Sequence, residues 1–203
     1  MQQQSDSLLG AAHGMTTRRL SLHPARPEYM DAIAEMALTG AIDWPWGGRS
    51  ESAESFRESS VAGVLCQFVA VTRLNGAPVG LVRATGANFF HRFAYLQALF
   101  PSSSRGQGLP AEALAVFVDY LFRRYAFRNL YAEMIQPVYD ALMTGSERLF
   151  DVEGRFREHA LHEGEFVDKV VLTVRHQSWL EQRERLLKMV GSRRDAYRGD
   201  VIH

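Results

Sequence analysis

"SSSRGQGLPAEAL", residues 102–114, is the stretch that decides the fold. A serine run leads to an arginine, two glycines one residue apart and a proline, and the residues after the proline favour a helix. The unpaired N–H groups in the first turn of a helix, together with the helix dipole, attract an anion. Taken alone, the stretch predicts either a cradle for phosphate oxygens or an ordinary Gly-Pro turn into a helix.

The segments around this stretch alternate between strand-like and helix-like patterns. Residues 91–100 read as a strand that ends at Pro101, and residues 109–127 read as an amphipathic helix. Asn-Gly within "NGAP" predicts a hairpin inside residues 67–87. Further strands are expected at 18–24, 129–135 and, as a second hairpin, 154–176, with helices at 27–38, 51–61, 137–150 and 178–190. The order predicts an α/β (mixed α+β) fold whose sheet has helices on both faces.

Length and charge limit the classes of partner. A chain of 203 residues predicts one domain, expected over residues 17–190, with flexible tails at 1–16 and 191–203. Lys+Arg and Asp+Glu both count 23, so no net field recruits nucleic acid or an anionic membrane. No apolar run approaches the roughly 20 residues of a membrane helix, and the amino terminus lacks a secretion signal. We expect a cytoplasmic protein without a membrane partner.

Cysteine and histidine usage predicts neither a disulfide nor a metal site. Cys66 is the single cysteine, which excludes an intramolecular disulfide and agrees with a reducing compartment. It lies in the apolar run "VAGVLCQFVAV", so we expect a buried structural thiol rather than a nucleophile. The seven histidines show no metal-ligand spacing, and His159 and His162 are expected at the surface.

Four segments together resemble the GNAT superfamily of acyl-CoA-dependent N-acyltransferases. "RGQGLPAEAL" is similar to the family's glycine turn and long helix, and "WPWGG" with "ESFRES" is similar to its Pro-Trp loop and second helix. "YAEMI" is similar to the fifth strand of the family, and "VEGRFREHALHEGEFVDKVVLTVRHQSWL" is similar to its closing hairpin. The likeness covers residues 18–180 and is closest to the RimJ/RimL-like branch of ribosomal-protein alanine acetyltransferases. It implies a mixed, mostly antiparallel sheet of about seven strands that splays between strands 4 and 5.

The resemblance implies acetyl-CoA or another acyl-CoA as co-substrate and no metal. The pyrophosphate would face the main chain of Arg105, Gly106, Gln107, Gly108, Leu109 and Pro110. Pantetheine would pair with backbone near Leu99 and Phe100, as an added strand does. Pro110 departs from the family's Gly/Ala and removes one amide, although a proline also presets a helix's first turn.

The family's catalytic positions are altered in this chain. Val138 replaces the usual asparagine, Ala141 occupies the small position and Gly145 replaces the tyrosine that protonates the thiolate. Tyr139 is then preferred over Ser146 as the general acid, and a packing role for the Tyr139 ring is equally open. Glu133 acting through water, or His91, could serve as the base, although a paired glutamate and an exposed histidine are the alternatives. The residues expected on the substrate side are Trp44, Trp46, Tyr95 and Gln97. The two tryptophans would either stack on the substrate or cover the core.

Three functions follow from these features. The first is transfer of an acyl group, most simply acetyl, from acyl-CoA to a small-molecule or peptide primary amine through a tetrahedral intermediate. The second keeps the transfer but takes the acyl group from a carrier protein or an aminoacyl-tRNA, with Arg123, Arg124 and Arg128 as a basic patch. The third is a non-catalytic CoA-binding or interaction module. A homodimer is left open, because relatives often pair.

Overall fold

The computed structural model describes residues 15–39, 52, 54, 56, 63–104, 106–142 and 150–192. Its strands are β1 (Leu20–Pro24), β2 (Val64–Thr72), β3 (Pro78–Asn88), β4 (Phe93–Leu99), β5 (Asn129–Ile135), β6 (Asp151–His162) and β7 (Glu165–Arg175). Its helices are α2 (Pro27–Leu38), α4 (Leu109–Arg124), α5 (Gln136–Leu142) and α6 (His176–Met189), with a 3-10 turn η1 (Ser102–Ser104).

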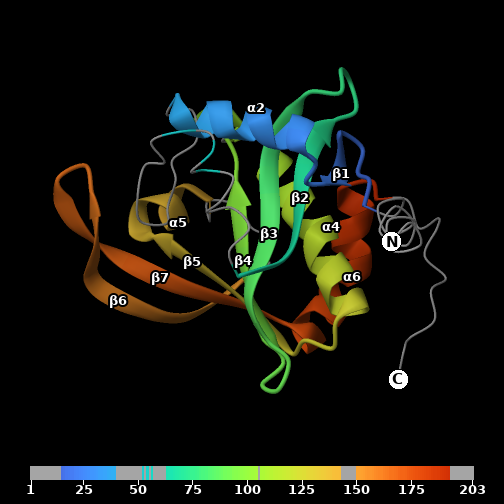
Figure 1. The fold of residues 1–203 in the computed structure, drawn as a ribbon. Helices are drawn as coiled ribbons and strands as arrows, with labels where there is room; N and C mark the ends of the chain where they lie inside the picture. The colour runs from blue at the N-terminus through green and yellow to red at the C-terminus, as the bar shows by residue number, and fades with distance from the viewer. Residues whose placement is uncertain are drawn as a thin grey trace.

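The seven strands form one mixed sheet, in agreement with the sequence (Figure 1). Their order is β1-β2-β3-β4-β5-β7-β6. The pair β4–β5 is parallel, and every other neighbouring pair is antiparallel. The mostly antiparallel sheet that the family resemblance implied is therefore confirmed.

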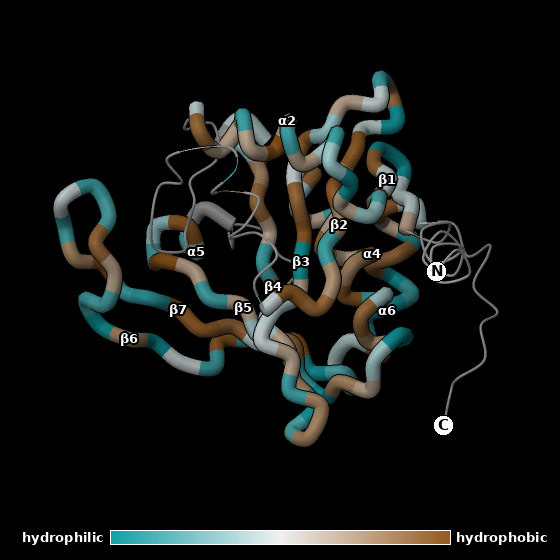
Figure 2. Tube along the Cα trace, in the orientation of Figure 1, coloured by the Kyte–Doolittle hydropathy of each residue, from teal (hydrophilic) through white to brown (hydrophobic). Residues whose placement is uncertain are grey.

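Helices cover both faces of the sheet because the strands alternate apolar residues between the faces. On β2, Val69 and Val71 belong to a buried cluster with α2. Their neighbours Phe68 and Ala70 belong to the larger cluster with α4 and α6. Figure 2 shows hydrophobic residues concentrated in the central strands and α4, and mostly hydrophilic residues along β6, at the edge of the sheet.

The two predicted hairpins are present, joining β2 to β3 and β6 to β7. Several boundaries differ from the sequence prediction; β2, for example, begins at Val64 rather than at residue 67. The helix expected to reach residue 127 ends at Arg124, because Tyr125 adopts extended backbone. The closing hairpin begins earlier, at Asp151, and α5 begins at Gln136 directly after β5. Most of the helix expected at 51–61 lies outside the described residues, as do residues 143–149 and most of both predicted tails.

Candidate functional site

The two central parallel strands separate partway along their length. β4 and β5 pair only at Phe93–Asn129, Ala94–Leu130 and Tyr95–Tyr131. Beyond these pairs β4 stays hydrogen-bonded to β3 as far as Leu99, while β5 stays with β7 as far as Ile135. The carboxyl-terminal halves of the two strands therefore have no ladder between them, and the sheet is splayed where the resemblance implied it.

The glycine loop lies at the same end of the sheet, between β4 and α4. Gly106 and Gly108 have φ values of +76° and +73°, in the left-handed region that favours glycine. Gly108 is the N-cap residue of α4, and no side chain caps the helix. Within the described part of the chain, the amides of Gly108, Leu109 and Ala111 donate to no protein acceptor, while the Glu112 amide donates to the Gly108 carbonyl at 3.0 Å. The first N–H groups of a helix have no acceptor within the helix, so this turn has the donors to bind an anion.

Pro110 occupies the first turn of α4, as the sequence predicted. It has no N–H, so it takes one donor away from the helix end. Leu109 is buried and anchors the start of the helix in the core. The predicted contribution of Arg105 falls outside the described residues.

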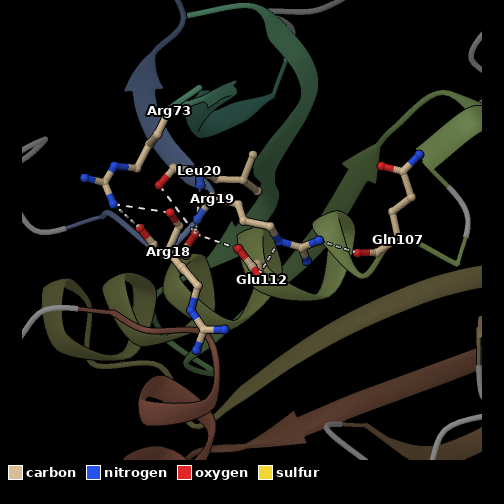
Figure 3. A network of polar contacts seen from close by, with 7 residues as sticks. Arg18, Arg19, Leu20, Arg73, Gln107 and Glu112 are labelled. Carbon is tan, nitrogen blue, oxygen red and sulfur yellow. Dashed lines mark hydrogen bonds and ion pairs between the residues drawn. The ribbon is translucent and has the colours of Figure 1, made fainter. Parts of the chain in front are cut away.

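A polar network joins the start of β1 to this loop (Figure 3). The Arg19 guanidinium donates from Nη1 to the Gln107 carbonyl at 2.7 Å and from Nε to Glu112 Oε1 at 2.8 Å. The Thr17 hydroxyl donates to the other Glu112 oxygen at 2.7 Å and accepts the Leu20 amide at 2.9 Å. The carboxylate in the first turn of α4 is thus held from two sides by the segment leading into β1.

Leu99 and Phe100 lie at the splayed end of β4, where the sequence predicted pairing with pantetheine. The Leu99 side chain is buried on the α2 face, and Phe100 packs against the α4 face. Gly80 on β3 faces this point so closely that a Cβ placed there would lie 2.7 Å from the Leu99 carbonyl oxygen and 2.4 Å from the Phe100 ring. The backbone approach of β3 and β4 here depends on a glycine.

The face of the sheet beneath α2 carries the predicted substrate-side residues of β4. Tyr95 and Tyr131 lie opposite each other, with ring centroids 5.8 Å apart. Gln97 lies opposite Arg83 and accepts a hydrogen bond from its Nε. Burial lowers the pKa of the Arg83 guanidinium. Trp44 and Trp46, the other two predicted substrate-side residues, lie outside the described residues.

Arg83 and Tyr131 were not singled out from the sequence. A signal existed in both strands, because alternation places Arg83 on the same face as buried Leu81 and places Tyr131 on the face opposite buried Leu130. An arginine at a core-facing strand position is uncommon and marks a polar environment. The sequence alone does not reveal that Gln97 is its partner across the strands.

The fold places two of the three predicted acid–base residues at the splayed end and the third at the opposite end. Tyr139 on α5 is half-buried against the α4-side core, and the Arg155 guanidinium lies over its ring at 5.1 Å. Glu133, near the end of β5, pairs with Lys169 Nζ at 3.0 Å, which agrees with the alternative of a paired glutamate. His91 lies in the turn before β4, at the paired end of that strand rather than the splayed one. Tyr139 and Glu133 share the splayed end; His91 does not. The positions of Gly145 and Ser146 fall outside the described residues.

Other expectations for reactive groups can be placed. Cys66, expected to be buried, is half-buried, and burial raises the pKa of its thiol to about 12, in agreement with a structural cysteine rather than a nucleophile. His159 is exposed and His162 half-buried on the β6–β7 hairpin. Across the described ranges, no group of three or more His, Cys, Asp or Glu residues is placed to hold a metal ion. None of the helices described here is long and apolar enough to cross a membrane.

The strand order, the splayed parallel pair and the glycine loop before a long helix define the GNAT fold. A chimera of the spermidine N-acetyltransferase SpeG from Vibrio cholerae and hSSAT superposes with a TM-score of 0.68 at 19% identity, covering 79% of this chain and 98% of that chain. SpeG from Vibrio cholerae in complex with manganese ions superposes with a TM-score of 0.64 at 20% identity, covering 81% and 96%. No family model and no curated protein sequence matches the chain.

Proposed function

We propose that this protein is an N-acyltransferase that moves an acyl group, most simply acetyl, from acyl-CoA to a primary amine. One observation carries the proposal: the splay between β4 and β5 and the open amides before α4 lie at the same end of the sheet. A ligand with an extended arm and a diphosphate could occupy both together. Acyl-CoA has that chemistry, and solved N-acetyltransferases share the fold.

The residues at this end fit such a ligand. The amides of Gly108, Leu109 and Ala111 would receive diphosphate oxygens, and the absence of a Cβ at Gly108 lets the oxygens approach the main chain. The pantetheine arm would lie along the end of β4 near Leu99 and Phe100 and fill the backbone gap left by the splay. Main-chain donors there would polarise the thioester carbonyl.

Proton transfer falls to groups near the splay. Tyr139 would protonate the departing thiolate from α5, and Glu133 would accept the amine's proton through water. Tyr95 and Gln97 would contact the acceptor on the α2 face. Spermidine is the first acceptor to test, because N-acetyltransferases of that substrate share the fold. The RimJ/RimL-like branch, with a protein α-amine as acceptor, stays a prediction from the sequence.

A macromolecular donor has less support. Arg123 and Arg124 close α4 at its far end, about 24 Å from the glycine loop along a 16-residue helix. Arg123 also forms an ion pair with Asp119 at 2.8 Å, so its charge is partly neutralised within the protein. The basic patch is therefore remote from the place where an acyl group would be transferred.

The test is calorimetric titration of the full chain with CoA and acetyl-CoA. We expect binding by the unchanged protein, and at least about tenfold weaker binding after Gly108→Glu, which places an anion and a side chain where the diphosphate would lie. Gly164→Glu is the matched control, because Gly164 also has a positive φ, +89°, but lies in the β6–β7 turn. A failure of the unchanged protein to bind any acyl-CoA would refute the proposal.

Catalysis needs a separate measurement. CoA release is followed with acetyl-CoA and an amine panel that contains spermidine, spermine and peptides with free α-amines. Transfer to any of these amines supports an enzyme and identifies the acceptor class. CoA binding without transfer to the panel would favour the non-catalytic module.

A further inference from the structure

Arg19 links three parts of the chain around the glycine loop (Figure 3). Its guanidinium bonds the Gln107 carbonyl and the Glu112 carboxylate at the same time, and these partners lie 88 and 93 residues away in the sequence. We propose that Arg19, held by Glu112, is a positioning residue that turns the main chain of the loop toward the diphosphate of the coenzyme. This proposal rests on the proposed function.

The geometry of the peptide bond explains how a bond to a carbonyl can orient an amide. The peptide joining Gln107 to Gly108 is planar and trans, so its C=O and N–H point in opposite directions. With the Gln107 oxygen fixed on Arg19, the Gly108 N–H is directed to the other side of the loop. Among the described residues, that amide is the first ahead of α4 with no protein acceptor. Gln107 is flanked on both sides by glycines with positive φ. Without the bond to Arg19, these glycines would let the peptide rotate easily.

The carboxylate holds the arginine in place. Glu112 is only 12% exposed, and its two oxygens bond Arg19 and Thr17 separately. Thr17 in turn accepts the amides of Arg19 and Leu20 at the start of β1, which ties the network to the sheet. Because the guanidinium is planar and its donors diverge at fixed angles, it can satisfy a carboxylate and a carbonyl together; a lysine ammonium lacks that fork.

A positioning role and a direct charge contact predict opposite effects at Glu112. If Arg19 acted only as a positive charge near the diphosphate, removing the adjacent carboxylate would strengthen CoA binding or leave it unchanged. If Arg19 acts by holding the loop, removing Glu112 releases the guanidinium and weakens binding, although a negative charge has been removed. The sign of the change separates the two.

The experiment measures the affinities of CoA and of pantetheine, which lacks the diphosphate, for the full chain. Arg19→Ala and Glu112→Ala are each expected to weaken CoA binding about tenfold, the loss of one good bond to a charged group, and to leave pantetheine binding unchanged. Glu112→Gln keeps an oxygen acceptor for Arg19 and should restore most of the affinity. Arg175→Ala is the matched control: Arg175 also contacts carboxylates and is 47% exposed against 44% for Arg19, but it lies on β7.

Three results would overturn the proposal. One is CoA binding by Glu112→Ala that equals or exceeds that of the unchanged protein. Another is an equal loss of CoA and pantetheine affinity, which would indicate general damage to the fold. The third, no CoA binding by the unchanged protein, would overturn the proposed function as well and is thereby distinguished from the first two. Should the alanine variants fail to fold, Arg19→Lys must still weaken CoA binding more than Glu112→Gln does.

Discussion

Gly80→Ala tests whether the close approach of β3 and β4 shapes the splayed end of the sheet. An added Cβ would lie 2.4 and 2.5 Å from two carbons of the Phe100 ring and 2.7 Å from the Leu99 carbonyl oxygen. Carbon atoms in contact prefer about 3.5–4.0 Å. The ring must therefore move by roughly 1 Å and the backbone of Leu99 by several tenths of an ångström.

The expected cost follows from these overlaps. Forcing one extra carbon into a packed site destabilises a protein by about 1–3 kcal/mol, and each kcal/mol lowers Tm by about 2–4 °C in a domain of this size. We expect Tm to fall by roughly 2–12 °C. The displaced backbone is the part of β4 proposed to pair with pantetheine, so the affinity for CoA should fall while the affinity for ADP, which carries only the diphosphate half, stays the same.

Thermal melts measure the change in Tm, and calorimetric titrations with CoA and ADP measure the two affinities. Gly154→Ala is the control, because Gly154 also lies within a strand but a Cβ there meets no atom within 4 Å. An unchanged Tm and CoA affinity after Gly80→Ala would refute the reasoning about close approach. Equal losses of Tm and CoA affinity in Gly80→Ala and Gly154→Ala would also refute it. Such losses would show that alanine in any strand has this effect, whatever its contacts.

Three further predictions concern single side chains. Tyr139→Phe should lower kcat of acyl transfer at least about 100-fold with Tm nearly unchanged, as for loss of a general acid; an unchanged kcat would assign the ring to packing. Asp119→Ala should lower the free energy of unfolding by about 1–3 kcal/mol in urea without changing CoA affinity, because buried Asp119 binds Arg183 and Arg123. Burial raises the pKa of the Cys66 thiol to about 12, so iodoacetamide should react slowly at pH 8 until the protein unfolds. Above about pH 9 the unfolded thiol loses a proton that the folded one keeps, so this group lowers stability as pH rises.

The strands and hairpins could be predicted from the sequence because their signals are local, whereas the splayed, mostly antiparallel sheet was what the family resemblance implied. Asn75-Gly76 specifies one hairpin, and the alternation of Phe68 and Val69 divides β2 between two cores. Each of these patterns depends on neighbours within a few residues. The start of α5 was predicted to within one residue, because Pro137 favours the first turn of a helix directly after the strand.

The candidate site could be predicted only in part, because the contacts that shape it include long-range ones. The glycine pattern at 106–108 and the position of Pro110 are visible in the sequence, since they reflect local backbone requirements. The bond from Arg19 to Gln107 spans 88 residues, and nothing near Arg19 distinguishes it from Arg18. The role of Gly80 is equally hidden, because only the packed structure shows Phe100 lying over it.

The two halves of the proposed coenzyme site depend on different kinds of contact, and this has a measurable consequence. At the pantetheine end the geometry depends on a missing side chain at Gly80, and at the diphosphate end on the polar network of Arg19. The contacts of Gly80 and those of Arg19 involve no common residue, so the effects of Gly80→Ala and Arg19→Ala on the free energy of CoA binding should add within about 0.5 kcal/mol. Ser104, whose amide donates to the Pro101 carbonyl at 2.8 Å, lies between the two ends. A double variant that departs from additivity by more than 1 kcal/mol would mean that this turn transmits the displacement of Phe100 to the glycine loop, and the two ends would then act as one rigid unit.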